Sequence, residues 1–543
     1  MQLQYLRKQL ERIDLPLLLF LLLFMDVKLA VKVVAILLIY ILRWNTAFRF
    51  SFKNTRLPLF YPAVIIIAIV NYLVYRGFAN THYSIAFITG IAFWVLCILA
   101  CHQVKLAVDM NEPQVIHNTL FVFFVLNMVV SFAKLGWIMW DAGSINPYRY
   151  QGMYQKYFIG TGDLIRGIAF DTSTTNALIN ACGVIYFITR GKAGAALLCM
   201  IVLLLTGSNS TNILLLGIFI LLLVRGIDNT RKSVLLVCCI FLVVFMAKVS
   251  PQNNTYAMHI AERPFVKLDS GKHPVPVADT PLSQKPDIEL SPEERREKIA
   301  ILYLDSVSTR HVQQEKLAGI AVIPTSNTNQ KPLVPKDNIH SATFQHRSDS
   351  VTASQAILTN YLVTNKQSLV LPEKEKSLPG KAIAGIQLYQ FFRAHPEKLL
   401  TGDGMGNFSS KLAFKTTALN IDGSYPKQLA YISPDFRDNH LAIYAHYFSM
   451  DSGLHSVAYS PDSVYYQLAG EYGIMGLAVF LFGYVLYFYR RLPQRSYGIP
   501  LLFLLCGAFF IEYWFEQLSI VILFELLLFL DIKENQLVGV NQT

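Results

Sequence analysis

The chain has 543 residues, of which 53% are hydrophobic and only 15% are charged, and its mean hydropathy is +0.39. Soluble globular domains carry about 25% charged residues, so this composition excludes an ordinary soluble protein. The net charge of +11 does not indicate a nucleic-acid ligand, because the basic residues lie in short loops between apolar runs.

Apolar runs follow one another from the N-terminus to the C-terminus. A helix needs roughly 20 apolar residues to cross a bilayer, so these runs predict about ten to twelve membrane spans. We expect an all-α polytopic membrane protein with one large, partly helical periplasmic loop between the late helices. The predicted spans are residues 15–25, 28–43, 57–75, 83–101, 119–140, 172–189, 193–207, 210–225, 233–249, 463–489, 498–514 and 517–531.

Lysine and arginine determine the predicted orientation, because positive charge resists translocation. With a cytoplasmic N-terminus, every strongly basic short loop stays inside, and segments 141–171 and 250–461 lie outside. The first apolar run has no small-residue cleavage site and is followed by Asp26 and Lys28, so we expect a retained span rather than a signal peptide. The inside residues are Arg7, Lys8, Arg12, Arg43, Arg49, Lys53, Arg56, Arg190, Lys192, Arg225, Arg231, Lys232, Arg490, Arg491 and Arg495.

Composition divides the chain into four regions. Residues 1–249 form an N-terminal transmembrane bundle of about nine helices, 250–376 a flexible polar insertion, 377–461 a structured periplasmic loop and 462–543 the C-terminal transmembrane helices. The insertion is rich in Pro, Ser, Thr, Asn, Gln and Lys, and only residues 291–303 carry helix-start signals. All seven cysteines lie in apolar segments, which predicts neither a disulfide scaffold nor a zinc site.

The structured loop begins with a predicted amphipathic helix over residues 379–400. Ile386, Tyr389 and Phe392 recur at helical spacing, so we expect this helix to lie along the membrane surface. It leads into Gly402, Gly404 and Gly406, which we call the glycine run (402–406). Alternate glycines can expose amides to an anion, which suits a diphosphate, although such a run is also typical of a plain turn.

Three groups of residues are predicted to lie together on the outer face. The first is the loop that contains Arg166 and Asp171 and ends at Asn176. The second is the turn 207–211, Gly-Ser-Asn-Ser-Thr. The third is the stretch 402–476, which contains the glycine run, a segment from 434 to 440, and the sequence Glu-Tyr-Gly-Ile-Met-Gly at 471–476.

In order and topology, these groups resemble the O-antigen ligase and polymerase superfamily, membrane glycosyltransferases that use undecaprenyl-diphosphate-linked glycans. The family's Arg-x-x-Gly-x-Phe is similar, slightly compressed, to residues 166–170, its Gly-x-Gly-x-Gly-x-Phe to 402–408, and its Glu-x-Gly-x-x-Gly to 471–476. The similarity covers roughly residues 120–530. It implies a bacterial inner membrane, an undecaprenyl-diphosphate-linked donor and an acceptor that is a glycan, lipid A core or protein.

The chain departs from the family pattern at two positions. Asn209 stands where the family has an arginine in the small polar turn, and Asp462 stands nine residues before Glu471, where the family has a histidine. His455 lies seven residues earlier. Two alternatives follow: a short insertion displaced the histidine to His455, or this chain uses a different base.

Transfer of a glycan from a lipid diphosphate requires charge stabilisation on the leaving group and a base for the acceptor hydroxyl. Arginine matches phosphate oxygens through its planar fork of donors, and Arg166 and Arg437 are the candidates. Histidine titrates near neutrality, which makes His455 the first candidate base and His440 the second. The resemblance implies a metal-independent reaction without a cofactor.

Each candidate also has a purely structural interpretation. Arg166 could mark a membrane interface, and Arg437 could pair with Asp435 or Asp438. His440 and His455 could have surface or capping roles, and Glu471 is expected to orient the loop. Lys134, inside the fifth span, is costly in lipid and is expected to face a cavity.

Two functions from other classes fit the same sequence. One is a transporter or flippase for a lipid-linked or soluble glycan, although the chain has no visible internal repeat and its distinctive residues gather on one face. The other is a sensor or assembly scaffold without catalysis. Substitution of Arg166 or Arg437 would leave glycan products unchanged if the chain were a scaffold.

Overall fold

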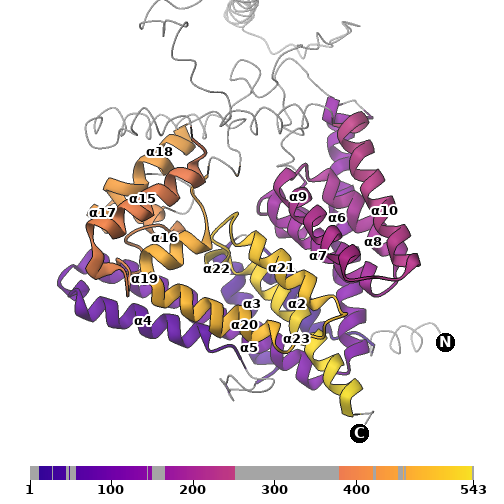
Figure 1. Cartoon of the computed structure of the whole chain (residues 1–543), viewed down its shortest axis with the longest axis horizontal. Coiled ribbons are helices and arrows are strands. Elements are labelled where there is room, and N and C mark those ends of the chain that lie inside the picture. Colours follow the sequence, from indigo (N-terminus) through magenta and orange to yellow (C-terminus); the bar gives the residue numbers. More distant parts are fainter. Residues whose placement is uncertain are drawn as a thin grey trace, which may run out of the picture. The chain divides into compact units, whose positions relative to one another are not determined.

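A computed structural model describes residues 12–26, 28–44, 48, 57–142, 145–149, 165–250, 378–419, 424–449, 457 and 460–540. Regular structure in these ranges is helical (Figure 1). The helices are α2 (Leu15–Phe24), α3 (Leu29–Leu42), α4 (Phe60–Val74), α5 (Thr81–Met110), α6 (Pro113–Ala142), α7 (Ser173–Thr189), α8 (Ala193–Leu205), α9 (Asn209–Val224), α10 (Asn229–Val244), α15 (Gly380–Ala394), α16 (Lys411–Lys415), α17 (Pro434–Phe436), α18 (Ala442–Ser449), α19 (Val464–Phe480), α20 (Leu486–Tyr489), α21 (Gly498–Ala508), α22 (Trp514–Gln517) and α23 (Ser519–Val540).

Short 3₁₀ and π segments connect or extend these helices. The 3₁₀ segments are η1 (Gly77–Ala79), η2 (Pro147–Arg149), η4 (Gly167–Ala169), η8 (Pro396–Lys398) and η9 (Lys427–Leu429), and the π segments are η5 (Phe245–Val249), η10 (Arg437–Leu441) and η12 (Leu481–Val485). η12 joins α19 to α20, so residues 464–489 form one long apolar helical segment.

Each predicted span contains a helix, because an apolar run in a bilayer must satisfy its backbone polar groups within itself. Four helical segments are long and apolar enough to cross a membrane: Thr81–Met110, Pro113–Asp141, Asn229–Val249 and Val464–Tyr489. Six further apolar helices of 10–17 residues are shorter, namely α2, α3, α4, α8, α9 and α21. The described chain is therefore a helical membrane protein.

Short polar residues at the predicted loop ends start several of these helices. Oδ1 of Asp14 accepts the amide of Leu17 at 3.0 Å at the start of α2, and Oδ1 of Asn80 accepts the amide of Tyr83 at 3.1 Å at the start of α5. Thr172 caps α7 in the same way. These side chains satisfy amides that have no partner inside the helix.

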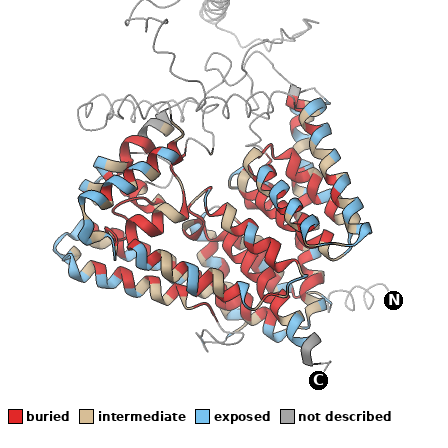
Figure 2. Cartoon of the chain, viewed as in Figure 1, coloured by how far each residue is buried: buried red, intermediate tan, exposed pale blue. Residues whose placement is uncertain are grey.

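Burial separates central helices from peripheral ones (Figure 2). α7 is buried along nearly its whole length, and the part of α23 before Lys533 is buried as well. By contrast, α3, α4, α9 and α10 expose large apolar side chains such as Ile41, Val74, Val224 and Val243. Helices that are apolar outside as well as inside suit a lipid surrounding.

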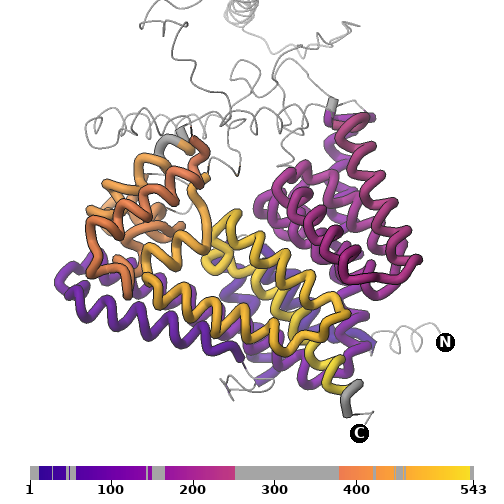
Figure 3. Tube along the Cα trace, viewed as in Figure 1, coloured from indigo at the N-terminus to yellow at the C-terminus, as the bar shows by residue number. Residues whose placement is uncertain are grey.

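The C-terminal helices pack into the N-terminal bundle. α23 lies against α5 and α7, and α21 lies against α7 and α9. α19 runs beside α4, as the trace shows (Figure 3). All described residues belong to one compact unit, made of Met1–Pro264 and Val334–Thr543.

The predicted structured loop 377–461 is helical where it is described, and it has its own apolar core. Ile383 of α15, Phe414 of α16, Phe436 of α17 and Tyr444 of α18 pack together with Tyr513 from the C-terminal region. We call residues 378–449 the outer loop. The predicted helix at 379–400 is α15 followed by η8.

The apolar stripe predicted on α15 is not the face that packs inside the protein. Tyr389 is 69% exposed and Ile386 is also exposed, whereas Ile383 and Phe391 are buried. Two of the three stripe residues are thus exposed, whereas Phe392 is half-buried beside Phe391. The insertion 250–376, with its predicted helix at 291–303, lies outside the described residues.

Candidate active site

The glycine run lies in a break of α19. Gly473 interrupts this helix with φ 66° and ψ −163°. The amide of Asp403 donates to the carbonyl of Gly470 at 2.9 Å, and the amide of Gly404 donates to the carbonyl of Glu471 at 3.0 Å. A chain segment from the outer loop therefore supplies the hydrogen bonds that the interrupted helix lacks.

The broken helix also donates hydrogen bonds to the outer loop. The amides of Ile474 and Met475 donate to the carbonyls of Leu399 and Leu400, at 3.0 and 3.1 Å. Asn71 of α4 fastens the run from the other side, because its Nδ2 donates to the carbonyl of Gly402 at 2.9 Å. The break, the glycine run and α4 thus form one backbone junction.

Glycine is required at this junction because the backbones approach too closely for a Cβ atom. A Cβ on Gly473 would lie 2.4 Å from the carbonyl oxygen of Leu400, and a Cβ on Gly402 would lie 2.4 Å from the carbonyl carbon of Glu471. Both glycines also have positive φ, 66° and 75°. Other residues would combine backbone strain with steric overlap.

This geometry alters the predicted role of the glycine run as a diphosphate cradle. The amide of Gly402 donates to the carbonyl of Lys398 at 2.7 Å, and the amides of Asp403 and Gly404 are used by α19. These three amides offer nothing to an anion. The positive φ angles of Gly402, Gly404 and Gly406 instead let the run enter the break.

Arg166 lies on a turn that buried asparagines hold in place. Gly167 has φ 58°, and a Cβ there would lie 2.3 Å from Oδ1 of Asn127. That oxygen accepts the amide of Ile168 at 3.1 Å, and Nδ2 of Asn127 donates to Oδ1 of Asn176 at 2.9 Å. The turn therefore presents an exposed Arg166 on a rigid base.

Charged side chains from four distant segments gather around Lys411 at the start of α16. The Lys411 cluster consists of Asp171, Lys411, Asp462, Glu512 and Glu516, all of them half-buried. Burial lowers the pKa of the Lys411 ammonium, but the four carboxylates outweigh burial and raise this pKa overall. The cluster therefore holds a charged lysine among carboxylates that keep some contact with solvent.

Burial raises the pKa of two members of the cluster, Glu512 and Glu516, to about 7, and Glu516 is the one whose side chain contacts α16. Its Oε2 accepts the amide of Leu412 at 3.3 Å. Burial raises the pKa of Glu516 to about 7, although Lys411 and Lys415 act against the rise. A carboxyl with this pKa can take a proton from a hydroxyl at neutral pH, which is the work of a general base.

The cluster joins two of the three groups that the sequence predicted on one face. Asp171 comes from the first group, five residues after Arg166, and Asp462 comes from the third. Asp462 also stands where the resemblance places a histidine. In the second group, the hydroxyls of Ser208 and Thr211 lie 3.0 Å apart at the start of α9.

The two outer-loop candidates Arg437 and His440 have ordinary structural surroundings. Nε and Nη2 of Arg437 donate to Asp438 at 2.7 and 3.3 Å, as the structural interpretation predicted. His440 is fully buried, and its ring centroid lies 4.7 Å from that of Phe408. Neither ring nitrogen has a hydrogen-bond partner among the described residues.

Burial lowers the pKa of His440 to about 3. The imidazole is therefore neutral, but it has no contact with solvent or with a substrate hydroxyl, and a buried base out of reach cannot accept the proton. The physical reason is packing: the helical segment η10 turns His440 toward Phe408 and the outer-loop core. His455 lies outside the described residues.

Two other predicted residues have clear positions. The side chain of Glu471 is buried, and its backbone carbonyl accepts the amide of Gly404, which fits the predicted role in orienting the loop. Lys134 is exposed on the surface of α6 rather than buried in a cavity. Among the described residues, no three His, Cys, Asp or Glu side chains are placed to hold a metal ion.

Comparison with protein-family models, with curated proteins and with solved structures found no match for this chain.

The sequence did not single out Lys411, Glu512 or Glu516. The sequence did contain a pattern for the two glutamates. Both lie near the junction of the predicted spans 498–514 and 517–531, in a region that has few other acidic residues. Lys411 had no distinguishing pattern. It gains its place only because α16 packs against the C-terminal region.

Proposed function

We propose that the chain is a membrane glycosyltransferase of the O-antigen ligase or polymerase type. It would transfer or polymerise an undecaprenyl-diphosphate-linked glycan at the periplasmic face of a bacterial inner membrane. The observation that carries the proposal is the Lys411 cluster, which unites Asp171 and Asp462 with a glutamate whose pKa is about 7. The resemblance in motif order supplies the donor class.

In this proposal the base is a carboxylate instead of a histidine. Glu516 accepts the proton of the acceptor hydroxyl, and the oxygen attacks the anomeric carbon of the donor sugar as the bond to the diphosphate breaks. Lys411 keeps Glu516 oriented and favours its ionised form. Asp462 adds negative charge where the resemblance expects a histidine.

Arg166 is assigned to the leaving group. The bond that breaks leaves its electron pair on the diphosphate, and a guanidinium next to that charge stabilises the transition state. Arg166 suits this role because its side chain is exposed on a fixed turn and Asp171, five residues later, belongs to the Lys411 cluster. In this proposal, base and cation come from two segments that Asp171 links through the Lys411 cluster.

The first experiment measures the size distribution of surface polysaccharide from cells that lack the gene. The cells are complemented with the wild-type gene, Arg166→Ala or Glu516→Gln, and with Asp438→Asn as the control for an exposed outer-loop carboxylate. Single repeats attached without long chains indicate a polymerase, and long chains left on the lipid carrier indicate a ligase. A normal ladder from both site variants would reject the catalytic assignment.

A transporter or flippase is the second candidate, and one observation favours it. α19 is discontinuous at Gly473, and transporters often build their binding sites from discontinuous membrane helices. The two functions are separated with purified protein in proteoliposomes that contain a lipid-linked glycan. Movement of the glycan across the bilayer without a new glycosidic bond would support the transporter.

A further inference from the structure

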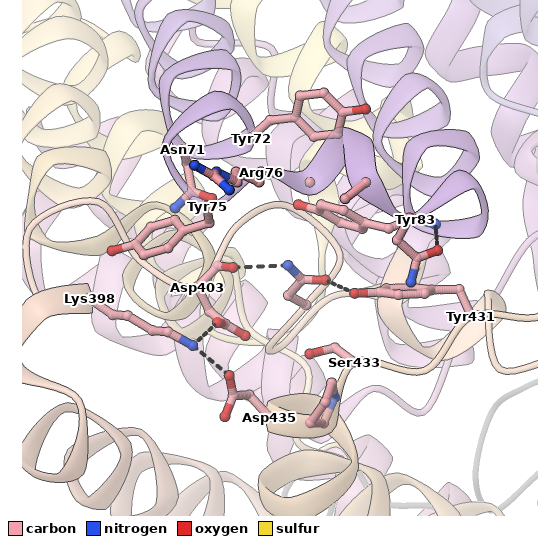
Figure 4. Close-up of a pocket in the computed structure, with 15 residues that line it drawn as sticks. Asn71, Tyr72, Tyr75, Arg76, Tyr83, Lys398, Asp403, Tyr431, Ser433 and Asp435 are labelled. Carbon is pink, nitrogen blue, oxygen red and sulfur yellow. Dashed lines mark hydrogen bonds and ion pairs between the residues drawn. The ribbon is translucent and has the colours of Figure 1, made fainter.

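A second site is a cavity that no member of the Lys411 cluster lines. It has a volume of about 340 Å³ and lies between the end of α4, the start of α5 and the outer loop (Figure 4). Gly404 of the glycine run packs against two of its lining residues, since a Cβ there would lie 2.6 Å from Oδ1 of Asn71 and 2.8 Å from Oη of Tyr83. The loop after α4 and the outer loop were predicted on the same side of the membrane.

A lysine between two aspartates forms one wall of this cavity. Nζ of Lys398 lies 2.6 Å from Oδ1 of Asp403 and 2.6 Å from Oδ2 of Asp435. Figure 4 shows Lys398 joined to both carboxylates. The ammonium therefore occupies the position that a metal ion bound by these carboxylates would take.

The pKa values of the two aspartates are shifted in opposite directions. Burial raises the pKa of Asp403 well above its usual range, while the hydrogen bond from Lys398 outweighs burial and holds the pKa of Asp435 below its usual range. Oδ2 of Asp403 is buried and has no hydrogen-bond partner among the described residues. The cavity wall thus presents two carboxyl groups that share Lys398, and Asp435 is the more exposed of the two.

Carboxamide and phenol groups add further donors and acceptors. Oη of Tyr431 donates to Oδ1 of Asn407 at 2.8 Å, and Nδ2 of Asn407 donates to the carbonyl of Asp403 at 2.9 Å. These bonds fix the orientation of both side chains. A ligand with hydroxyl groups, each a donor and an acceptor, can complete such a lining.

Tyrosine rings supply the apolar part of the lining. Tyr72, Tyr75, Tyr83 and Tyr431 all line the cavity, and the ring centroids of Tyr83 and Tyr431 lie 5.1 Å apart. Tyr75 is 41% exposed. Tyrosine combines an apolar ring face with a polar edge, which suits a ligand that has both C–H faces and hydroxyl groups.

We propose that this cavity binds a saccharide unit through the carboxyl pair of Asp403 and Asp435, the Asn407 carboxamide and the Tyr75 ring. A diphosphate is disfavoured because two aspartates line the wall and Lys398 already pairs with both, so that Arg76 is the lining cation outside these pairs. A purely apolar ligand is disfavoured because it would leave Asp403 unsatisfied. The volume, about 340 Å³, lies at the small end of ligand pockets and suits one or two sugar rings.

Saccharide binding does not depend on catalysis, because it is argued from the lining alone. Its role as a subsite for the growing or accepting glycan rests on the proposed function. A transporter or a scaffold could also use the cavity to hold a glycan. The test therefore measures binding in the absence of any lipid-linked donor.

The experiment uses the full-length protein in lipid nanodiscs on a printed array of bacterial surface oligosaccharides. The oligosaccharide that binds best is then titrated in free form by calorimetry. Tyr75→Ala removes an exposed ring from the cavity, and Tyr389→Ala removes an even more exposed tyrosine of α15 that does not line the cavity. Asp403→Asn tests the carboxyl, with thermal melts to verify folding of every variant.

We expect Tyr75→Ala to weaken binding at least tenfold, and Tyr389→Ala to change it less than twofold. If Asp403→Asn does not fold, Tyr75→Ala still tests saccharide binding, because removal of an exposed ring leaves the packing of the core unchanged. No binding to any printed oligosaccharide, or equal loss in both tyrosine variants, would overturn the proposal. Binding without glycan transfer would retain the saccharide site and reject the glycosyltransferase.

Discussion

Two charged groups lie at opposite ends of α7, and they differ in how many carboxylates they bring together. At the C-terminal end, Glu534 accepts hydrogen bonds from Arg190 at 2.8 Å and Tyr497 at 3.1 Å, and it lies 2.7 Å from Nε2 of His117. Nδ1 of His117 lies 2.5 Å from Oη of Tyr186. We call these five residues the Glu534 network.

At the N-terminal end of α7 lies the Lys411 cluster. Its four carboxylates lie around Lys411, its side chains keep contact with solvent, and Lys381 and Lys415 act on its carboxylates as well. A network centred on one carboxylate stabilises the contacts between helices, whereas several carboxylates in a partly solvated site with raised pKa values suit proton exchange. The comparison teaches that the surroundings of the carboxylates, rather than the number of charges, separate a structural network from a candidate active site.

The largest expected effect is on stability and concerns the break in α19 at Gly473. Gly473→Ala places a Cβ 2.4 Å from the carbonyl oxygen of Leu400 at a φ of 66°. We expect it to destabilise the protein by about 3 kcal/mol, because strain and overlap add. Thermal melts in nanodiscs measure the loss.

The matched control is Gly217→Ala in α9, where a Cβ would meet nothing within 4 Å. That substitution should stabilise the helix slightly, by about 0.5 kcal/mol. Equal stability of the two variants would show that the junction between α19 and the glycine run is not required for the fold.

Glu516→Gln tests the catalytic role proposed for the Lys411 cluster. Loss of a general base should lower the transfer rate about 100-fold at pH 7 while the melting temperature stays close to that of the wild type. In the wild type, the rate should rise as pH increases through about 7, because only the ionised Glu516 accepts a proton. Transfer assays with purified protein across this pH range measure both effects.

Lys411→Met sharpens the same test. Removal of the ammonium should move the rise in rate to higher pH, because Lys411 lowers the pKa of Glu516. Lys427→Met, at an exposed position in η9, is the matched control and should leave the profile unchanged. A wild-type pH profile in Lys411→Met would separate Lys411 from the base.

Glu534→Gln tests the structural role of the Glu534 network. Glutamine cannot accept all the hydrogen bonds that the carboxylate accepts, so we expect a loss of about 2 kcal/mol in stability with an unchanged transfer rate per folded molecule. Asp438→Asn, which removes an exposed pair with Arg437, should cost less than about 0.5 kcal/mol. A catalytic defect in folded Glu534→Gln would break the distinction between the two ends of α7.

The smallest effect at neutral pH concerns His440. The unfolded chain protonates this histidine below about pH 6.5, whereas the folded chain resists protonation until about pH 3, so its contribution to stability is complete above 6.5 and falls as pH decreases. His440→Leu should therefore be neutral at pH 7.5 and should recover about 2 kcal/mol relative to the wild type at pH 5. Melts at both pH values test this, and a loss of transfer at pH 7.5 would restore His440 as a base candidate.

The sequence predicted the helices well because the relevant physics is local. A run such as 172–189 is apolar along its length and has Thr172 as a cap, and these two properties suffice to predict α7. The order of loops along the chain likewise predicted that Asp171 and Asp462 lie on one side. By contrast, the glycine run was interpreted as an anion site because its amides were counted as free.

The sequence by itself determined a helical membrane protein, because hydrophobic length is a property of short stretches. Only the tertiary structure decided that the glycine run closes a broken helix, that His440 is buried, and that Lys411 meets carboxylates from α22 and from the residues just before α7, α19 and α22. The physical reason is that burial, pairing and pKa depend on contacts between residues hundreds of positions apart, which no local pattern specifies.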